Sequence, residues 1–111
     1  MASSATPVVE HRGTENRYVI TVDGEPAGFT SYRDRGAQRV FFHTEIDDRF
    51  AGRGLASTLV TEALAEVRAD GRRVVPVCPY WAAYIGKHPE AADVTDPVDP
   101  AVRRWLREQL G

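Results

Sequence analysis

The sequence contains one cysteine (Cys78) and one lysine (Lys87) among its 111 residues. A single cysteine excludes a disulfide within the chain and is typical of a reducing compartment, so we expect a cytoplasmic location. No apolar run approaches the roughly 20 residues that a membrane-spanning helix needs. Residues 1–7 lack the basic start and apolar centre of a secretory signal. We therefore expect no association with a membrane.

Charge and metal-binding residues exclude two further classes of protein. The net charge is −2 and the isoelectric point about 5.9, so the chain lacks the basic surplus of a nucleic-acid-binding domain. Its three histidines and one cysteine do not follow the spacing of metal ligands, and we expect no metal. A chain of this length forms one hydrophobic core. We expect a loose, polar lead-in over residues 1–15 and a single domain over residues 16–111.

Three segments rich in β-formers follow the lead-in. Tyr18–Val22 and about Ala27–Arg33 are separated by Asp23-Gly24, a two-residue hairpin turn. The third segment, Arg39–Ile46, alternates along its length. This alternation assigns Val40, Phe42, Thr44 and Ile46 to one face, and Phe41, His43 and Glu45 to the other. Short turns between consecutive strands predict an antiparallel meander.

After the third strand, the spacing of apolar residues changes to that of a helix. Over about residues 54–69 they recur every three to five positions, which predicts an amphipathic helix. Val74–Cys78 is a short apolar strand, and a strand reached through a helix should lie parallel to the one before it. Pro79 begins a short helix that Gly86 ends, and Asp99 caps a last helix. The pattern predicts an α+β fold: a meander, a helical crossover to a parallel strand, and helices packed on the mixed sheet.

The junction between the third strand and the long helix carries the motif Arg49-x-x-Gly52-x-Gly54. Two glycines there allow several backbone N–H groups to converge, and the helix N-terminus adds its own unpaired N–H groups and positive dipole end. Such a loop binds anions, most often phosphate, and Arg53 adds a second positive charge beside Arg49. Ser57 stands where a dinucleotide-binding fingerprint needs its third glycine. A simple glycine-rich turn with solvated arginines remains the alternative.

Four motifs in order resemble those of a compact, single-domain subgroup of the GNAT superfamily of acyl-CoA-dependent N-acyltransferases. They are His43-Thr44-Glu45-Ile46, Gly52-Arg53-Gly54-Leu55-Ala56, Pro76-Val77-Cys78-Pro79-Tyr80 followed by Tyr84, and His88-Pro89-Glu90. The resemblance spans roughly residues 18–90. It implies a compact GNAT-like fold in which the strands before the loop and after its helix separate, so that the pantetheine arm of an acyl-CoA enters the gap. Beyond residue 90 the chain departs from the usual superfamily pattern, which leaves the acceptor unspecified.

The resemblance also implies a reaction and a set of binding residues. The reaction is transfer of an acetyl group from acetyl-CoA to an amine, either of a small molecule or of a protein. The residues implied for binding the coenzyme are Ile46, Arg49, Phe50, Ala51, Gly52, Arg53, Gly54, Leu55 and Ala56. We expect a monomer or a weak homodimer.

Acyl transfer to an amine needs a base for the amine and a proton for the departing thiolate. Glu45 and His43 share one face of the strand that leads into the loop, so either can accept the amine proton. An exposed carboxylate and a polar-face histidine without a role are the alternatives. Tyr84 stands where the superfamily often places a tyrosine that protonates the thiolate, although it can equally be a packed aromatic. His88 is a further candidate base or ligand contact, or part of a structural turn.

Cys78 ends the strand that should border the thioester. Its thiol can take the acyl group covalently if its pKa is lowered, as a helix N-terminus can do. A lone buried cysteine is otherwise a small apolar residue. Direct attack by the amine and transfer through Cys78 therefore both remain open.

Two functions compete with an acetyltransferase. A non-catalytic acetyl-CoA- or CoA-binding module would need the same loop and would differ only in lacking turnover. A structural or interaction domain would use Trp105 and the last helix against a partner and would bind no coenzyme.

Overall fold

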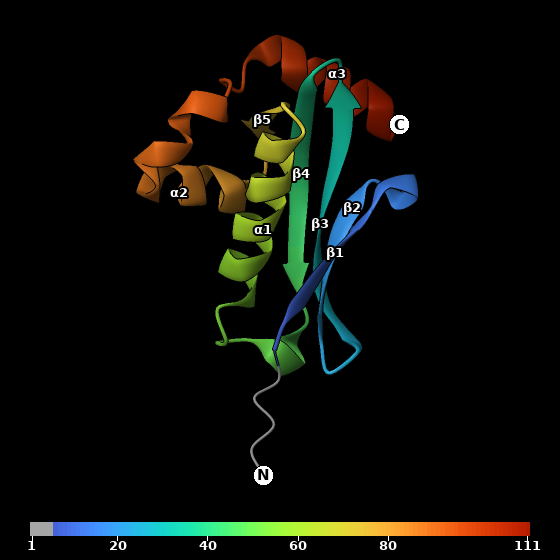
Figure 1. Ribbon diagram of the computed structural model, residues 1–111. Helices are drawn as coiled ribbons and strands as arrows, with labels where there is room; N and C mark the ends of the chain where they lie inside the picture. Colours follow the sequence, from blue (N-terminus) through green and yellow to red (C-terminus); the bar gives the residue numbers. More distant parts are fainter. Residues whose placement is uncertain (1–5) are drawn as a thin grey trace.

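The computed structural model describes residues 6–111 of the chain, and a five-stranded sheet with the order β1-β2-β3-β4-β5 forms its centre (Figure 1). The strands are β1 (Val8–Arg12), β2 (Arg17–Val22), β3 (Glu25–Arg35), β4 (Gln38–Ile46) and β5 (Arg73–Pro76). The helices are α1 (Leu55–Ala69), α2 (Pro79–Lys87) and α3 (Pro100–Leu110), with short 3₁₀ turns η1 (Gly13–Glu15), η2 (Asp48–Phe50) and η3 (Pro89–Val94). The predicted α+β class is confirmed.

The meander and the crossover follow the predicted order. Asp23 and Gly24 both have positive φ, at 52° and 80°, as a tight turn between β2 and β3 requires. The strands β2, β3 and β4 pair antiparallel in sequence order, and α1 carries the chain across to β5, which lies parallel to β4. Asp99 caps α3, because its Oδ1 accepts a hydrogen bond from the N–H of Val102 at 2.8 Å.

The expected lead-in over residues 1–15 is wrong for its second half. Residues 1–5 lie outside the described part of the chain, but Val8–Arg12 form β1, which pairs antiparallel with β2. The His11 side chain ties this strand to β2, β3 and α1. The His11 ring stacks on Tyr18 at 4.2 Å, its Nε2 lies 2.7 Å from the Tyr32 hydroxyl, and its Nδ1 pairs with Glu66 of α1. The contacts with Tyr32 and Glu66 join residues far apart in the chain, and the local sequence pattern cannot reveal them.

Three element ends also differ from the sequence prediction. β5 ends at Pro76, so Cys78 lies beyond the strand, at the N-cap of α2. α2 continues through Gly86 to Lys87. The segment after it is not a plain loop, because it forms η3 and then a parallel bridge from Thr95 to Val74.

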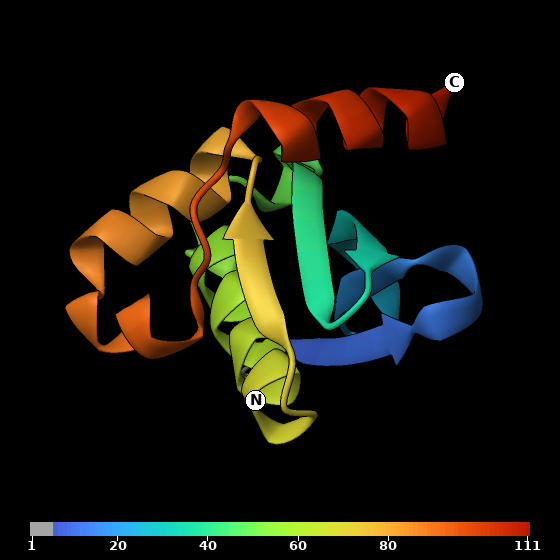
Figure 2. The same ribbon diagram turned by 90° about the horizontal axis from the view of Figure 1, so that it is seen from above.

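Two clusters of buried residues lie on opposite faces of the sheet. The larger one packs α1 and the Trp81 side chain of α2 against β2, β3 and β4. The smaller one joins Val102 and Leu106 of α3 to Val40 and Val75. Figure 2 shows α1 on one side of the sheet and α3 across the other. We call these the α1 face and the α3 face.

A β-bulge in β4 corrects the predicted faces of that strand. Ser31 pairs with His43 and Tyr32 with Phe41, so Phe42 is an extra residue on β4. The extra residue interrupts the alternation of side chains between the two faces of the sheet. Phe41, Thr44 and Ile46 lie on the α1 face, whereas Val40, Phe42, His43 and Glu45 lie on the α3 face. The prediction that His43 and Glu45 share a face holds, but Phe41 is not with them.

We expect Gly28→Ala to destabilise the fold by about 1–3 kcal/mol, because overpacking forces neighbouring atoms to move. A Cβ at Gly28 would lie 2.4 Å from the Glu45 carbonyl oxygen and 2.5 Å from the Ile46 Cδ1 atom. Urea denaturation measures the change. Gly86→Ala is the matched control, since a Cβ there meets no atom within 4 Å and alanine favours the helix. Equal stability of the two variants would contradict the close approach of β3 and β4.

A buried polar cluster surrounds the Arg39 guanidinium on the α1 face of the sheet. Arg39 is 4 % exposed; it donates hydrogen bonds to the Tyr18 hydroxyl at 2.7 Å and to Asp34 at 2.8 and 3.1 Å. Its guanidinium also lies 4.1 Å from the centre of the Tyr32 ring. Burial raises the pKa of Tyr18 to about 12, although Arg39 acts in the opposite direction. The pKa of Tyr32 is raised as well, again mainly by burial.

These raised pKa values predict a loss of stability in alkali. The unfolded chain releases the Tyr18 proton near pH 10 and the folded one near pH 12, so the unfolded state binds fewer protons in between. Stability is therefore fully present below about pH 10 and falls by up to about 3 kcal/mol toward pH 12. Urea unfolding at a series of pH values measures the slope. Tyr18→Phe should flatten it, and an unchanged slope in that variant would assign the effect to other groups.

Candidate functional site

The glycine loop has the backbone that its sequence predicts. β4 ends at Ile46, and Asp47 caps η2 by accepting a hydrogen bond from the Arg49 N–H at 2.9 Å. Gly52 and Gly54 have φ angles of 80° and 71°, in the left-handed region that favours glycine. Gly54 is the N-cap residue of α1. Both glycines are therefore required by the conformation of the loop.

Backbone donors at this loop are unpaired. Within residues 6–111, the N–H groups of Gly52, Arg53 and Gly54 have no hydrogen-bond acceptor, and the first bond of α1 runs from the Thr58 N–H to the Gly54 carbonyl. The N–H groups of the first helical turn are thus also unsatisfied within the helix. A Cβ built on either glycine meets no atom within 4 Å, so the loop is open to a ligand. This geometry fits a phosphate or pyrophosphate.

The two loop arginines differ in their availability. Arg49 is tied to Asp47, whose Oδ1 lies 3.2 Å from the Arg49 Nε. The hydrogen bonds from the Arg49 backbone and side chain lower the pKa of Asp47, so that carboxylate is ionised near neutral pH. Arg53 has no carboxylate partner among the described residues; its guanidinium lies 5.3 Å from the centre of the Phe50 ring. Arg53 is therefore the freer cation for an anionic ligand.

The strands β4 and β5 separate next to this loop. Their pairing ends at Phe41 and Pro76, and one further hydrogen bond runs from the Cys78 N–H to the Phe41 carbonyl at 2.9 Å. β4 continues to Ile46, while the chain after Cys78 turns into α2. Over the described residues, the last part of β4 has no strand beside it on this edge. The structure thus has the separation that the resemblance implies.

Cys78 stands at this fork, on the α1 face. Its side chain is 4 % exposed, and the thiol donates a hydrogen bond to the Thr44 hydroxyl at 3.4 Å. The Thr44 hydroxyl lies 2.9 Å from that of Thr30, which accepts a bond from the Trp81 indole N–H at 2.9 Å. Sequence analysis missed Thr30, Thr44 and Trp81 as neighbours of the thiol. Threonines in strands and a tryptophan in a helix are common core residues, so the sequence does not mark them as neighbours of a functional thiol.

His43 and Glu45 come together on the opposite face. The His43 Nε2 lies 3.0 Å from the Glu45 Oε2, and both side chains are exposed. The imidazole also contacts the Phe29 ring, with centroids 5.8 Å apart. Glu45 and Cys78 therefore approach the fork from different faces of the sheet and do not form a nucleophile–base pair.

Tyr84 lies on α2 and His88 at its C-terminal cap, and Tyr84 packs against the core cluster of the α1 face and contacts α1. The Tyr84 hydroxyl is 2.7 Å from that of Thr61 on α1, and its ring stacks on His88 at 3.9 Å. The His88 Nδ1 is 2.8 Å from the Tyr84 carbonyl oxygen. These rings and Lys87 border a hollow of about 240 Å³ between α1 and α2, which Ser57 of the first turn of α1 also lines. We call it the helix hollow; Ser57, which lines it, is three residues after Gly54 of the glycine loop.

Two other kinds of feature are absent from residues 6–111. No helix there is long and apolar enough to cross a membrane. In the same range, no three histidine, cysteine, aspartate or glutamate side chains gather in a way that can hold a metal ion.

Comparison with known proteins gives a family and a fold. The family model described as GCN5-related N-acetyl-transferase matches residues 17–94. A GCN5-like protein from Staphylococcus aureus, solved by NMR, has a TM-score of 0.64 at 17 % identity, covering 84 % of this chain and 91 % of that one. The ribosomal-protein-S18-alanine N-acetyltransferase from Escherichia coli has a TM-score of 0.50 at 19 % identity. That match covers 52 % of this chain, which spans only 38 % of the Escherichia coli enzyme. No curated protein matches the chain.

Proposed function

The chain belongs to the GCN5-related N-acetyltransferase family, and we propose that it transfers an acetyl group from acetyl-CoA to an amine. The observation that carries the proposal is the set of unpaired N–H groups at Gly52, Arg53 and Gly54, which open α1 beside the fork between β4 and β5. These donors and the Arg53 guanidinium would hold the pyrophosphate. The helix hollow and the fork would take the remainder of the coenzyme.

Acetyl-CoA supplies an activated acetyl thioester, and the chain's own residues would handle the protons. Glu45 would accept a proton from the acceptor amine, and the imidazole of His43 at 3.0 Å would orient the carboxylate. A carbon–nitrogen bond forms, the carbon–sulfur bond breaks, and the departing thiolate takes a proton. Tyr84 or Cys78 would supply that proton, since each carries one on a polar atom bordering the helix hollow or the fork.

Measurement of turnover tests the proposal against a non-catalytic binding module. Purified protein is incubated with acetyl-CoA and a panel of primary amines, and released coenzyme A is followed with a thiol reagent. Isothermal calorimetry on the same protein measures acetyl-CoA binding. Binding with turnover supports the acetyltransferase. Binding without turnover on any amine supports the module, and absence of binding contradicts both.

Glu45→Gln should lower turnover about ten- to a hundredfold and leave acetyl-CoA affinity nearly unchanged. The amide keeps the shape of the carboxylate but cannot accept a proton. We expect less than the full effect of losing a base because His43 lies close enough to replace it in part. Glu62→Gln, on the exposed side of α1, is the matched control. Wild-type turnover in Glu45→Gln would assign the base to His43, His88 or water.

A further inference from the structure

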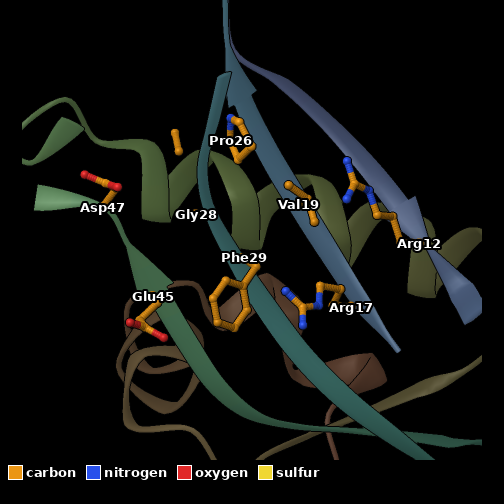
Figure 3. Close-up of a pocket in the computed structure, with 9 residues that line it drawn as sticks. Arg12, Arg17, Val19, Pro26, Gly28, Phe29, Glu45 and Asp47 are labelled. Atoms are coloured by element: carbon orange, nitrogen blue, oxygen red, sulfur yellow. The ribbon is translucent and has the colours of Figure 1, made fainter. Parts of the chain in front are cut away.

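A second hollow, of about 250 Å³, opens on the α3 face of the sheet (Figure 3). We call it the sheet hollow. Its floor includes Val19 of β2 with Gly28 and Phe29 of β3, and Glu45 of β4 lies at its border. The candidate base of the reaction therefore lines a cavity that is separate from the glycine loop and from the helix hollow.

Charges of opposite sign occupy the two ends of the sheet hollow. Figure 3 shows Arg12 and Arg17 at one end, Glu45 and Asp47 at the other, and the Phe29 ring between them. Asp47 is ionised near neutral pH, because the hydrogen bonds from Arg49 lower its pKa. The hollow is thus positive at one end, apolar in the middle and negative at the other end.

The arginine end has unused hydrogen-bonding capacity. The Arg17 Nε is buried and has no hydrogen-bond partner, and the nearest carboxylate oxygen, of Glu15, is 3.7 Å from it. The Arg17 guanidinium is instead held over the Phe29 ring, 4.6 Å from its centre. Among residues 6–111, the ion-pair partner of Arg12 is Glu10, at a long distance of 3.5 Å. A guanidinium that is positioned by an aromatic ring, with a donor left unpaired, is suited to an anionic ligand group.

We propose that the sheet hollow binds the acceptor, and that the acceptor is a primary amine joined by a methylene chain to a carboxylate or phosphate. The anionic group would pair with Arg17 and Arg12, the methylene chain would lie against Val19 and Phe29, and the amine would lie beside Glu45. The use of this amine in acetyl transfer rests on the proposed function, whereas binding in the hollow does not.

The register of the strands sets the length of the ligand. Glu45 of β4 is directly opposite Phe29, which is opposite Val19 of β2, and Arg17 is two residues along β2. Neighbouring strands lie about 4.8 Å apart and residues rise about 3.4 Å along a strand, so the Cα atoms of Arg17 and Glu45 are separated by roughly 12 Å. Both side chains extend into this span, which leaves room for a chain of about three to five methylene groups. An α-amino acid is too short to reach both ends. Linear ω-amino acids have the required length.

NMR titration tests the binding directly. Protein labelled with ¹⁵N is titrated with ω-amino carboxylates of increasing length, with their carboxamides, and with the matching aminoalkyl phosphates. We expect amide signals of Gly28, Phe29 and Glu45 to shift, with the tightest binding at about three to five methylene groups and about tenfold or more weaker binding of the carboxamides. Comparison of the carboxylate and phosphate series identifies the anionic group.

Two variants assign the effect to the arginine end. Arg17→Gln should weaken binding of the anionic ligands about ten- to a hundredfold, which is the range for a charge-assisted hydrogen bond, and should leave the carboxamides little changed. Arg33→Gln is the matched control, because Arg33 also lies over an aromatic ring, Phe42, but does not line the hollow. Equal binding of carboxylates and carboxamides, no binding of either, or an unchanged affinity in Arg17→Gln would overturn the inference.

A titration of the same samples with acetyl-CoA separates this inference from the proposed function. Shifts at Gly52–Leu55 on adding acetyl-CoA, without binding of ω-amino acids, would leave the proposed function in place and overturn the assignment of the hollow. Binding of ω-amino acids without any effect of acetyl-CoA would support the hollow as a ligand site and contradict the acetyltransferase.

Discussion

Gly54→Val is expected to abolish acetyl-CoA binding in a protein that still folds. Gly54 has a φ of 71°, and a β-branched residue disfavours that conformation by about 1–2 kcal/mol. The strain would move the backbone out of the left-handed region and reorient the unpaired N–H groups of Gly52, Arg53 and Gly54. Since these groups are the proposed pyrophosphate ligands, we expect a loss of affinity of more than about a hundredfold, or several charge-assisted hydrogen bonds.

The surroundings of Gly54 show that backbone strain is the cause of this effect, and a second glycine supplies its control. A Cβ at Gly54 meets no atom within 4 Å, so the valine would not clash with the protein itself. Gly71, at the C-terminal end of α1, has a φ of 69° and equally open surroundings. Gly71→Val should carry a similar strain and leave acetyl-CoA binding unchanged. Calorimetry on both folded variants decides the matter, and equal affinities would show that the glycine loop is not the phosphate site.

Structural features that depend on local backbone requirements could be predicted from the sequence, whereas features that depend on strand pairing could not. Gly54, Gly71 and Asp99 were predictable because each satisfies a local backbone requirement of a helix end. The bulge at Phe42 was not, since a two-residue period cannot reveal one extra residue on a strand. Its consequence is functional: Thr44 lies with Cys78 on one face, and Glu45 with His43 lies on the other.

The sheet hollow was hidden from the sequence for a related reason. Arg12, Arg17 and Glu45 come from three different strands, and only the pairing register places them around Phe29. Residues 8–12 also had no pattern that predicted a strand. Contacts of His11 with Tyr18, Tyr32 and Glu66 help to hold that strand on the sheet, and the last two join residues far apart in the chain.

In the proposed reaction, the route of the acetyl group depends on Cys78, and the surroundings of the thiol favour direct attack by the amine. The thiol is buried and donates a hydrogen bond to the Thr44 hydroxyl, and no base lies beside it among the described residues. Initial-rate plots for acetyl-CoA and an amine should therefore intersect, because both substrates must be bound at once. Parallel lines, together with a protein that gains an acetyl group from acetyl-CoA alone, would establish transfer through Cys78 instead.

Cys78→Ala should lower turnover by about a hundredfold and change acetyl-CoA affinity far less, because a single hydrogen-bond donor to charge that develops in the reaction is worth this much. The substitution leaves Thr44 paired with Thr30, so the fork should keep its shape. Cys78→Ser separates two explanations. A serine hydroxyl can still donate to Thr44 and to the fork but is a poor acyl carrier without a base. Recovery of turnover in Cys78→Ser would identify Cys78 as a hydrogen-bond donor at the fork. Equal loss of turnover in both variants would favour the covalent route. Wild-type turnover in Cys78→Ala would show that the thiol serves only to pack the core.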